Sequence, residues 1–144
     1  MKIAKRYLLL LFISCLYLSC GNDDAPPNAQ ELAFERLAGT WDLANGGSII
    51  IDGEDASLNY PNFGLSFTDG GYNTMNAGEL FSASGTWEWA NEEAGEITLD
   101  RLRTIIINDL TETNFQFSFT FTGSGGEANL IDGISGNYVI TVKK

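Results

Sequence analysis

Carboxylates and aromatic rings are the abundant side chains of this sequence that could do chemistry or recognise a ligand. The chain of 144 residues contains 19 acidic residues and no histidine. The absence of histidine excludes histidine-based acid–base catalysis, nucleophiles activated by histidine, and imidazole metal ligands. We therefore expect a protein that is not an enzyme and that holds neither a metal nor another cofactor.

The densest carboxylate clusters run from Asp52 to Asp55 and over Glu92-Glu93. The first offers the oxygen ligands that calcium prefers, but its glycine is misplaced for an EF-hand loop, and acidic turns are far commoner. Two carboxylates on either side of a sugar could hydrolyse it, yet no spacing singles out such a pair. Both clusters are therefore expected to be acidic turns.

Aromatic residues alternate with smaller or polar residues in several stretches. Rings with this spacing share one face of a strand, and large rings on such a face usually form the core. A second interpretation is that some rings line a partly open apolar cavity, in which Gly85 leaves room beside Trp87. The residues expected to line such a ligand site are Gly85, Trp87, Trp89, Phe115, Phe117 and Phe119.

The elements that position these rings are short runs with period-two alternation, which fill the chain after Thr40. Because hairpin-length turns mostly join the runs and no helix separates them, they favour an antiparallel sheet that meanders in sequence order. We predict an all-β fold, an up-and-down antiparallel β-barrel of about eight to nine strands, with room inside for side chains or one small ligand. The expected strands are residues 40–44, 48–52, 63–67, 72–76, 81–89, 96–100, 103–109, 115–121 and 138–142.

A short helix is expected before the first strand. Asn28 can cap its amino end, Glu31 stands at the capping-box position, and Gly39 ends it. A helix of this length needs support from the barrel.

The amino-terminal residues have the pattern of a secretory signal peptide. Lys2, Lys5 and Arg6 precede an apolar stretch over residues 7–18, which is too short to span a bilayer, since a span takes roughly 20 residues. We expect a signal peptide over residues 1–19, a flexible acidic tether over 20–29, and one domain over 30–144. Removing the three cationic residues takes the formal net charge from -11 to -14, so nucleic acid is not an expected partner.

The end of this signal, Ser19-Cys20-Gly21, resembles the lipobox of bacterial lipoproteins. The resemblance implies that Cys20 receives a lipid and becomes the mature amino terminus, although Tyr17 stands where the family prefers leucine. Cys15 is the rival site, but it would shorten the apolar stretch to about seven residues.

Asp23 and Asp24, close behind the cysteine, resemble the export signal of Bacteroidetes-type surface lipoproteins; the alternative is an ordinary solvated linker. The expected location is the outer membrane, facing either the periplasm or the cell surface.

Gly39-Thr40-Trp41, at the start of the first strand, returns as Gly85-Thr86-Trp87. With the helix and the meandering hairpins, this pattern resembles the lipocalin-like domains of bacterial lipoproteins over residues 31–144. The resemblance implies that Gly39 and Trp41 form the fold motif, with the tryptophan at the closed end of the barrel, and that the protein is a small-molecule carrier.

Two features depart from animal lipocalins. Their second motif, T-D-Y, is absent. They also have an arginine near the last strand that covers the tryptophan, where this sequence has only Lys143 and Lys144. Arg101 or Arg103 is a candidate to replace it.

The sequence thus indicates a membrane-anchored, monomeric, non-enzymatic binder of a small apolar or amphipathic ligand. The site is expected at the barrel mouth opposite Trp41, with the glycine-rich segment Gly123–Gly136 as a lid. The alternative is a surface interaction module that binds glycan or protein through exterior or loop aromatics.

Cys20→Ala is expected to move the protein from the membrane fraction to the soluble fraction, because each buried acyl methylene contributes about 0.8 kcal/mol of anchoring. The measurement is the distribution between the fractions after ultracentrifugation, with Cys15→Ala as the matched control. Retention of the Cys20→Ala variant together with release of Cys15→Ala would identify Cys15 as the lipidated residue.

Overall fold

The computed structural model describes residues 26–123 and 134–144. The predicted signal peptide, Cys20 and most of the tether lie outside these residues, as does most of the segment Gly123–Gly136 predicted as a lid. None of the helices in the described part of the chain has the length and hydropathy needed to cross a membrane. The elements are α2 (Ala29–Leu37), β1 (Gly39–Asp42), β2 (Ser48–Ile51), β3 (Glu54–Asp55), the 3-10 helix η2 (Ser57–Asn59), β4 (Gly64–Thr68), β5 (Gly71–Met75), β6 (Ser84–Trp89), β7 (Glu96–Leu99), β8 (Arg103–Leu110), β9 (Asn114–Phe121) and β10 (Gly136–Lys143).

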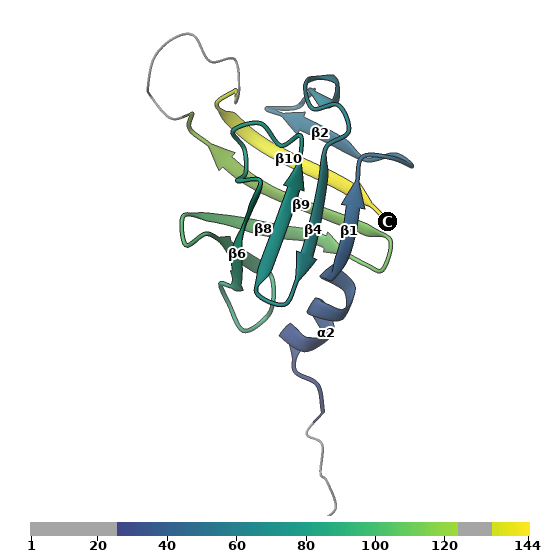
Figure 1. Ribbon diagram of the computed structural model, residues 1–144, viewed down its shortest axis with the longest axis vertical. Helices are drawn as coiled ribbons and strands as arrows, with labels where there is room; N and C mark the ends of the chain where they lie inside the picture. The colour runs from purple at the N-terminus through teal and green to yellow at the C-terminus, as the bar shows by residue number, and fades with distance from the viewer. Residues whose placement is uncertain (1–25, 124–133) are drawn as a thin grey trace, which may run out of the picture.

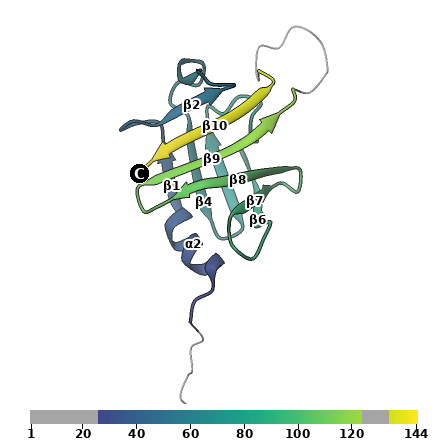
Figure 2. The same ribbon diagram turned by 180° about the vertical axis from the view of Figure 1, so that it is seen from behind.

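The strands form a closed eight-stranded antiparallel barrel in the order β1-β4-β5-β6-β7-β8-β9-β10, with β2 and β3 as outer strands (Figures 1 and 2). Pairing of β1 with β10 closes the ring, through the single register pair Asp42 and Lys143. The predicted all-β, up-and-down barrel with a short amino-terminal helix is confirmed. The short strand β3 was not expected; it pairs with β2 through the turn at Asp52.

Helix α2 has the predicted capping box. The Asn28 side chain accepts a hydrogen bond from the Glu31 backbone N–H, and the Glu31 carboxylate accepts one from the Asn28 N–H. Beyond the helix, Gly39 has a φ of +118°, a value that side chains other than glycine rarely tolerate. The chain therefore turns sharply from α2 into β1.

Trp41 is buried at the carboxyl end of α2, where it meets the last residue of the chain. Its indole Nε1 donates to the Leu37 carbonyl at 2.8 Å, and the Lys144 ammonium lies 4.2 Å from the centre of its ring. The same ammonium donates to the carbonyls of Arg36 and Ala38, each at 2.7 Å. The cation that covers Trp41 is thus Lys144.

Arg103 lies elsewhere, over the rings of Phe81, Phe119 and Phe121. Arg101 is exposed, and the cation over Trp41 is Lys144. The expectation that Arg101 or Arg103 replaces the missing arginine over Trp41 is therefore wrong.

The core consists of the inward positions of the strands, together with Leu37 of α2 and buried residues of the loops before β4 and before β6. In β9 every second residue from Phe115 to Phe121 is buried, as the alternation predicts. The strand predicted over 81–89 begins only at Ser84, because the preceding loop folds inward and buries Leu80 and Phe81. The Phe81 ring reaches those of Phe117 and Phe119, at centroid distances of 6.2 and 5.1 Å, so this loop plugs the barrel.

Trp41→Ala is expected to lower the free energy of unfolding by about 3–5 kcal/mol, because it leaves a cavity and removes the cover of the α2 carbonyls. Denaturant unfolding of the domain measures this loss. Trp41→Phe is the matched control: it keeps a ring but removes the bond to Leu37, so its loss should be smaller. An unchanged midpoint for Trp41→Ala would contradict the anchoring role.

Candidate functional site

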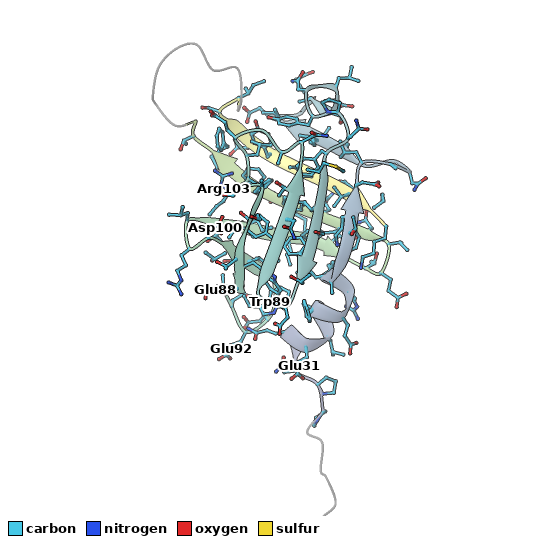
Figure 3. The ribbon with its side chains drawn as sticks, in the orientation of Figure 1. Glu31, Glu88, Trp89, Glu92, Asp100 and Arg103 are labelled. Carbon is cyan, nitrogen blue, oxygen red and sulfur yellow. The ribbon has the colours of Figure 1, made fainter. Side chains whose placement is uncertain are left out.

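Trp87 and Trp89 lie at the α2 end of the barrel, on the same side as Trp41. The Trp87 ring is 5.7 Å from that of Phe34 in α2, and its Nε1 donates to the Thr68 carbonyl at 2.8 Å. Trp89 packs edge-on against Trp87 at 5.1 Å, and Figure 3 shows it close to the helix and far from Arg103. The expectation that these tryptophans line a mouth opposite Trp41 is therefore wrong. Trp87 packs against Phe34 of α2 and Trp89 packs against Trp87, so both lie where the helix contacts the barrel.

The three predicted phenylalanines of β9 form a continuous column of rings through the barrel. Phe115 packs on Trp41 at 5.7 Å, Phe117 lies 4.8 Å from Phe115, and Phe119 lies 6.2 Å from Phe117. The column continues to Tyr138, stacked on Phe119 at 5.0 Å. These rings fill the interior, in line with the core interpretation.

The space that Gly85 leaves by having no side chain is filled by Tyr72 and Asp100, so no ligand can enter it. A Cβ at this position would lie 2.6 Å from the Tyr72 ring and would also overlap the Asp100 carboxylate. The Tyr72 hydroxyl donates to Asp100 Oδ2 at 2.5 Å, and the Thr86 backbone N–H donates to Oδ1 at 2.9 Å. Burial and the bond to Asp100 raise the pKa of Tyr72 to about 12, and the same bond lowers the pKa of Asp100. Gly85 therefore accommodates a structural hydrogen-bond cluster.

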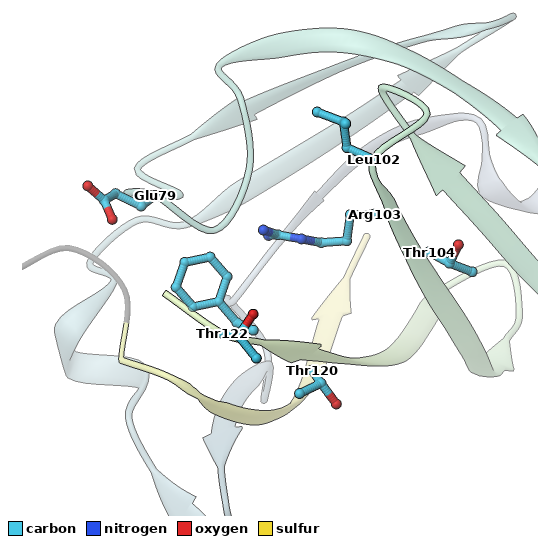
Figure 4. Close-up of a pocket in the computed structure, with 7 residues that line it drawn as sticks. Glu79, Leu102, Arg103, Thr104, Thr120 and Thr122 are labelled. Atoms are coloured by element: carbon cyan, nitrogen blue, oxygen red, sulfur yellow. The ribbon is translucent and has the colours of Figure 1, made fainter. Parts of the chain in front are cut away.

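Figure 2 shows β8 and β9 diverging away from the hairpin that joins them. A recess lies at this divergence, lined by residues of both strands. From the hairpin between them, β8 and β9 pair as far as Ile106 and Ser118. Residues 103–105 of β8 and 119–121 of β9 are therefore not paired with each other. We call this opening, of about 430 Å³, the wedge recess. It is lined by Glu79, Leu102, Arg103, Thr104, Thr120, Phe121 and Thr122 (Figure 4).

None of the six residues predicted to bind a ligand lines the wedge recess. A smaller recess of about 110 Å³ adjoins it and shares Glu79, Leu102 and Arg103 with it. Arg103 therefore lines both recesses. The loop that contains Leu80 and Phe81 fills the barrel interior next to them.

The guanidinium of Arg103 is held by aromatic rings instead of carboxylates. It lies 5.6, 5.4 and 4.9 Å from the ring centres of Phe81, Phe119 and Phe121, within the range of cation–π attraction. Its Nη1 is buried and has no hydrogen-bond partner among the described residues. Burial lowers the pKa of this guanidinium, although an arginine remains charged at any ordinary pH.

A second opening, the α2 groove, lies beside the helix and has a volume of about 420 Å³. Half-buried Trp89 lines it together with Trp87 and Phe34, while carboxylates and amides form its rim. The rim residues are Asn28, Gln30, Glu31, Asp69 and Glu88.

The acidic turn from Asp52 to Asp55 uses its carboxylates to hold the backbone. Asp52 accepts from both the backbone and the side-chain N–H groups of Asn137, at 3.0 and 2.9 Å, and these bonds lower its pKa. Asp55 accepts from the backbone and the hydroxyl of Ser57. Within residues 26–123 and 134–144, no group of three or more histidine, cysteine or acidic side chains is arranged to hold a metal.

Sequence reasoning missed Arg103 as a site residue, although a signal was present. Arg103 shares the inward period-two face of its strand with buried Ile105, so an inward-pointing cation was readable from the alternation. What the alternation could not indicate was the divergence of β8 from β9.

Comparison of the chain with protein-family models, with curated proteins and with solved structures finds no match. The functional argument therefore depends on the geometry of the described residues.

Gly85→Ala is expected to lower the free energy of unfolding by about 1–3 kcal/mol, because the new methyl group overlaps Tyr72 and Asp100 and forces them to move. Gly95→Ala is the matched control, since its Cβ would meet nothing closer than Asn91 at 3.6 Å. Thermal unfolding of both variants measures the difference. Equal melting temperatures would show that the Tyr72–Asp100 cluster shifts at no cost.

Proposed function

We propose that this chain is a non-enzymatic, lipocalin-like binding protein that takes a small amphipathic ligand in the wedge recess. The observation that carries the proposal is the recess itself, which combines a cation and hydroxyl groups with exposed apolar surface. Leu102 is 90% exposed at its edge, and a leucine so exposed gains free energy when a ligand covers it.

The packing of the interior argues for an amphipathic ligand and against a purely apolar one. The column of rings from Trp41 through Phe115, Phe117 and Phe119 occupies the axis of the barrel, so a long apolar chain finds little space there. The wedge recess instead offers Arg103, a carboxylate and threonine hydroxyls beside Leu102. A compact ligand with one polar end fits this lining.

The membrane anchor is part of the proposal. A lipid on Cys20 would tether the monomeric domain to the outer membrane, facing the periplasm or the cell surface, with the tether entering at α2. In Figure 3, Arg103, which lines the wedge recess, lies well away from Glu31 of α2. The recess would thus face away from the tether, where it is accessible to a ligand.

The second candidate is a glycan-binding or protein-binding module, and the α2 groove supports it. Trp89 is half-buried there, with its ring beside polar rim residues such as Glu88 and Gln30. Stacking of a sugar ring on an aromatic face, with hydrogen bonds from such a rim, is a common mode of recognition. The groove lies close to the tether, which limits the size of a partner that can approach.

Nuclear magnetic resonance titration of the soluble domain distinguishes the two sites. Octanoate or 1-octanol is expected to shift the amide signals of Thr104 and Thr120 in a saturable way. Maltose, as a neutral sugar probe, would instead shift those of Gly70 and Glu88 if the α2 groove is the site. No saturable shift with either octyl compound would overturn binding in the wedge recess.

The matched variants in this titration are Leu102→Gln and Leu58→Gln. Both residues are almost fully exposed, at 90% and 96%, but only Leu102 lines the wedge recess. Leu102→Gln should weaken binding of the octyl compounds roughly fivefold, because partial burial of one leucine contributes about 1 kcal/mol. Leu58→Gln should leave binding unchanged.

A further inference from the structure

We propose that the wedge recess selects ligands with an anionic oxygen group, a carboxylate or a phosphate, which pairs with the guanidinium of Arg103. This inference rests on the proposed function, since it specifies the polar end of the ligand that the recess takes. It predicts discrimination between octyl compounds that differ only in their head groups.

Arg103 is a cation without a counter-ion in the described part of the chain. Its Nη1 is buried without a partner, whereas a buried guanidinium is normally paired with a carboxylate or with hydrogen-bond acceptors. The three rings around it replace part of the lost hydration but offer no acceptor oxygen. The half-buried residue presents the rest of its side chain to the recess, where an arriving oxyanion can complete the pairing.

The nearby carboxylates leave this position open. Asp100 is engaged by the Tyr72 hydroxyl and by the Thr86 backbone N–H. The carboxylate of Glu79, which lines the recess, points away from Arg103 (Figure 4). Neither Glu79 in the wedge recess nor Asp100 in the adjoining one is thus paired with the guanidinium of Arg103.

Backbone groups at the divergence of the strands add donors to the site. Backbone groups of a strand point alternately to its two neighbours, and the Ile107 N–H is bonded on the β7 side, to Gly95. The backbone groups of Thr104 therefore face β9. Because the β8–β9 pairing ends at Ile106 and Ser118, the N–H of Thr104 has no partner strand opposite it and can donate to a ligand oxygen.

The overall charge of the protein makes this a local effect. The formal net charge is -11 for the full sequence, so the long-range field repels anions. An anion that binds nonetheless must be held by short contacts within the recess. A simple ion without an apolar part lacks the contact with Leu102 and should bind poorly.

The test is isothermal titration calorimetry of the soluble domain with octanoate, 1-octanol, octylammonium and acetate. Octanoate is expected to bind about tenfold more tightly than 1-octanol, as a charge-assisted hydrogen bond allows, and octylammonium and acetate most weakly. Arg103→Gln should remove the preference for octanoate over 1-octanol. Arg101→Gln, which removes the same charge from an exposed neighbour, should preserve it.

The outcomes separate this inference from the function on which it rests. Equal affinities of the wild-type domain for octanoate and 1-octanol overturn the anion preference and leave the binding function in place. If acetate binds as tightly as octanoate, the proposal of an amphipathic ligand is overturned, and the recess is a site for simple anions. Absence of binding by all four compounds overturns both proposals.

Arg103→Lys keeps the test decisive if Arg103→Gln does not fold. The lysine retains the cation over the rings but not the planar fork that matches an oxyanion, so the preference for octanoate should fall without disappearing. The head-group comparison on the wild-type domain needs no variant at all. A wild-type preference for 1-octanol or octylammonium would contradict the proposal directly.

Discussion

The structure depends on how the carboxyl end of α2 is capped. The last carbonyls of a helix have no partner within the helix and must find donors elsewhere. Here the Trp41 indole bonds to Leu37 O, while the Lys144 ammonium bonds to the carbonyls of Arg36 and Ala38. The ammonium also lies over the Trp41 ring, so one compact cluster joins the helix, the first strand and the last residue.

This cluster supports the weakest seam of the barrel. Strands β1 and β10 close the ring with a single register pair, and Figure 1 shows the carboxyl terminus lying beside β1. Contacts made by Lys144 immediately beyond β10 therefore supplement a very short ladder. Since Trp41 also packs on Phe115 in β9, the cluster couples closure of the barrel to packing of its interior. The rings that begin at Trp41 and Phe115 fill the interior of the barrel. A ligand can therefore bind only in the barrel wall or at the ends of the barrel.

The wedge recess has a structural cause in β8. The register of β8 against β9 shifts between Ile107 and Asp109, and a bulge of this kind increases the local twist of a strand. The pairing ends at Ile106, next to this shift, and the strands then diverge. The side chain of Arg103 occupies the opening, where its guanidinium makes cation–π contacts with Phe119 and Phe121 of β9.

Local patterns were sufficient to predict the barrel, the capped helix and the inward face of β9. Each is governed by neighbours in sequence: the period of two places Phe115, Phe117 and Phe119 on one side, and the spacing of Asn28 and Glu31 forms the capping box. Long-range packing alone decided what those faces meet.

The tertiary structure packs Trp87 and Trp89 of β6 on the side of the barrel that α2 contacts. It also fills the space beside Gly85 with Tyr72 and Asp100, and it places Arg103 in the wedge recess. The reason is physical: alternation specifies which side of a strand a residue faces. Its height along the barrel and its partners depend on strand register, bulges and the path of the loops, which arise from contacts between residues far apart in the chain.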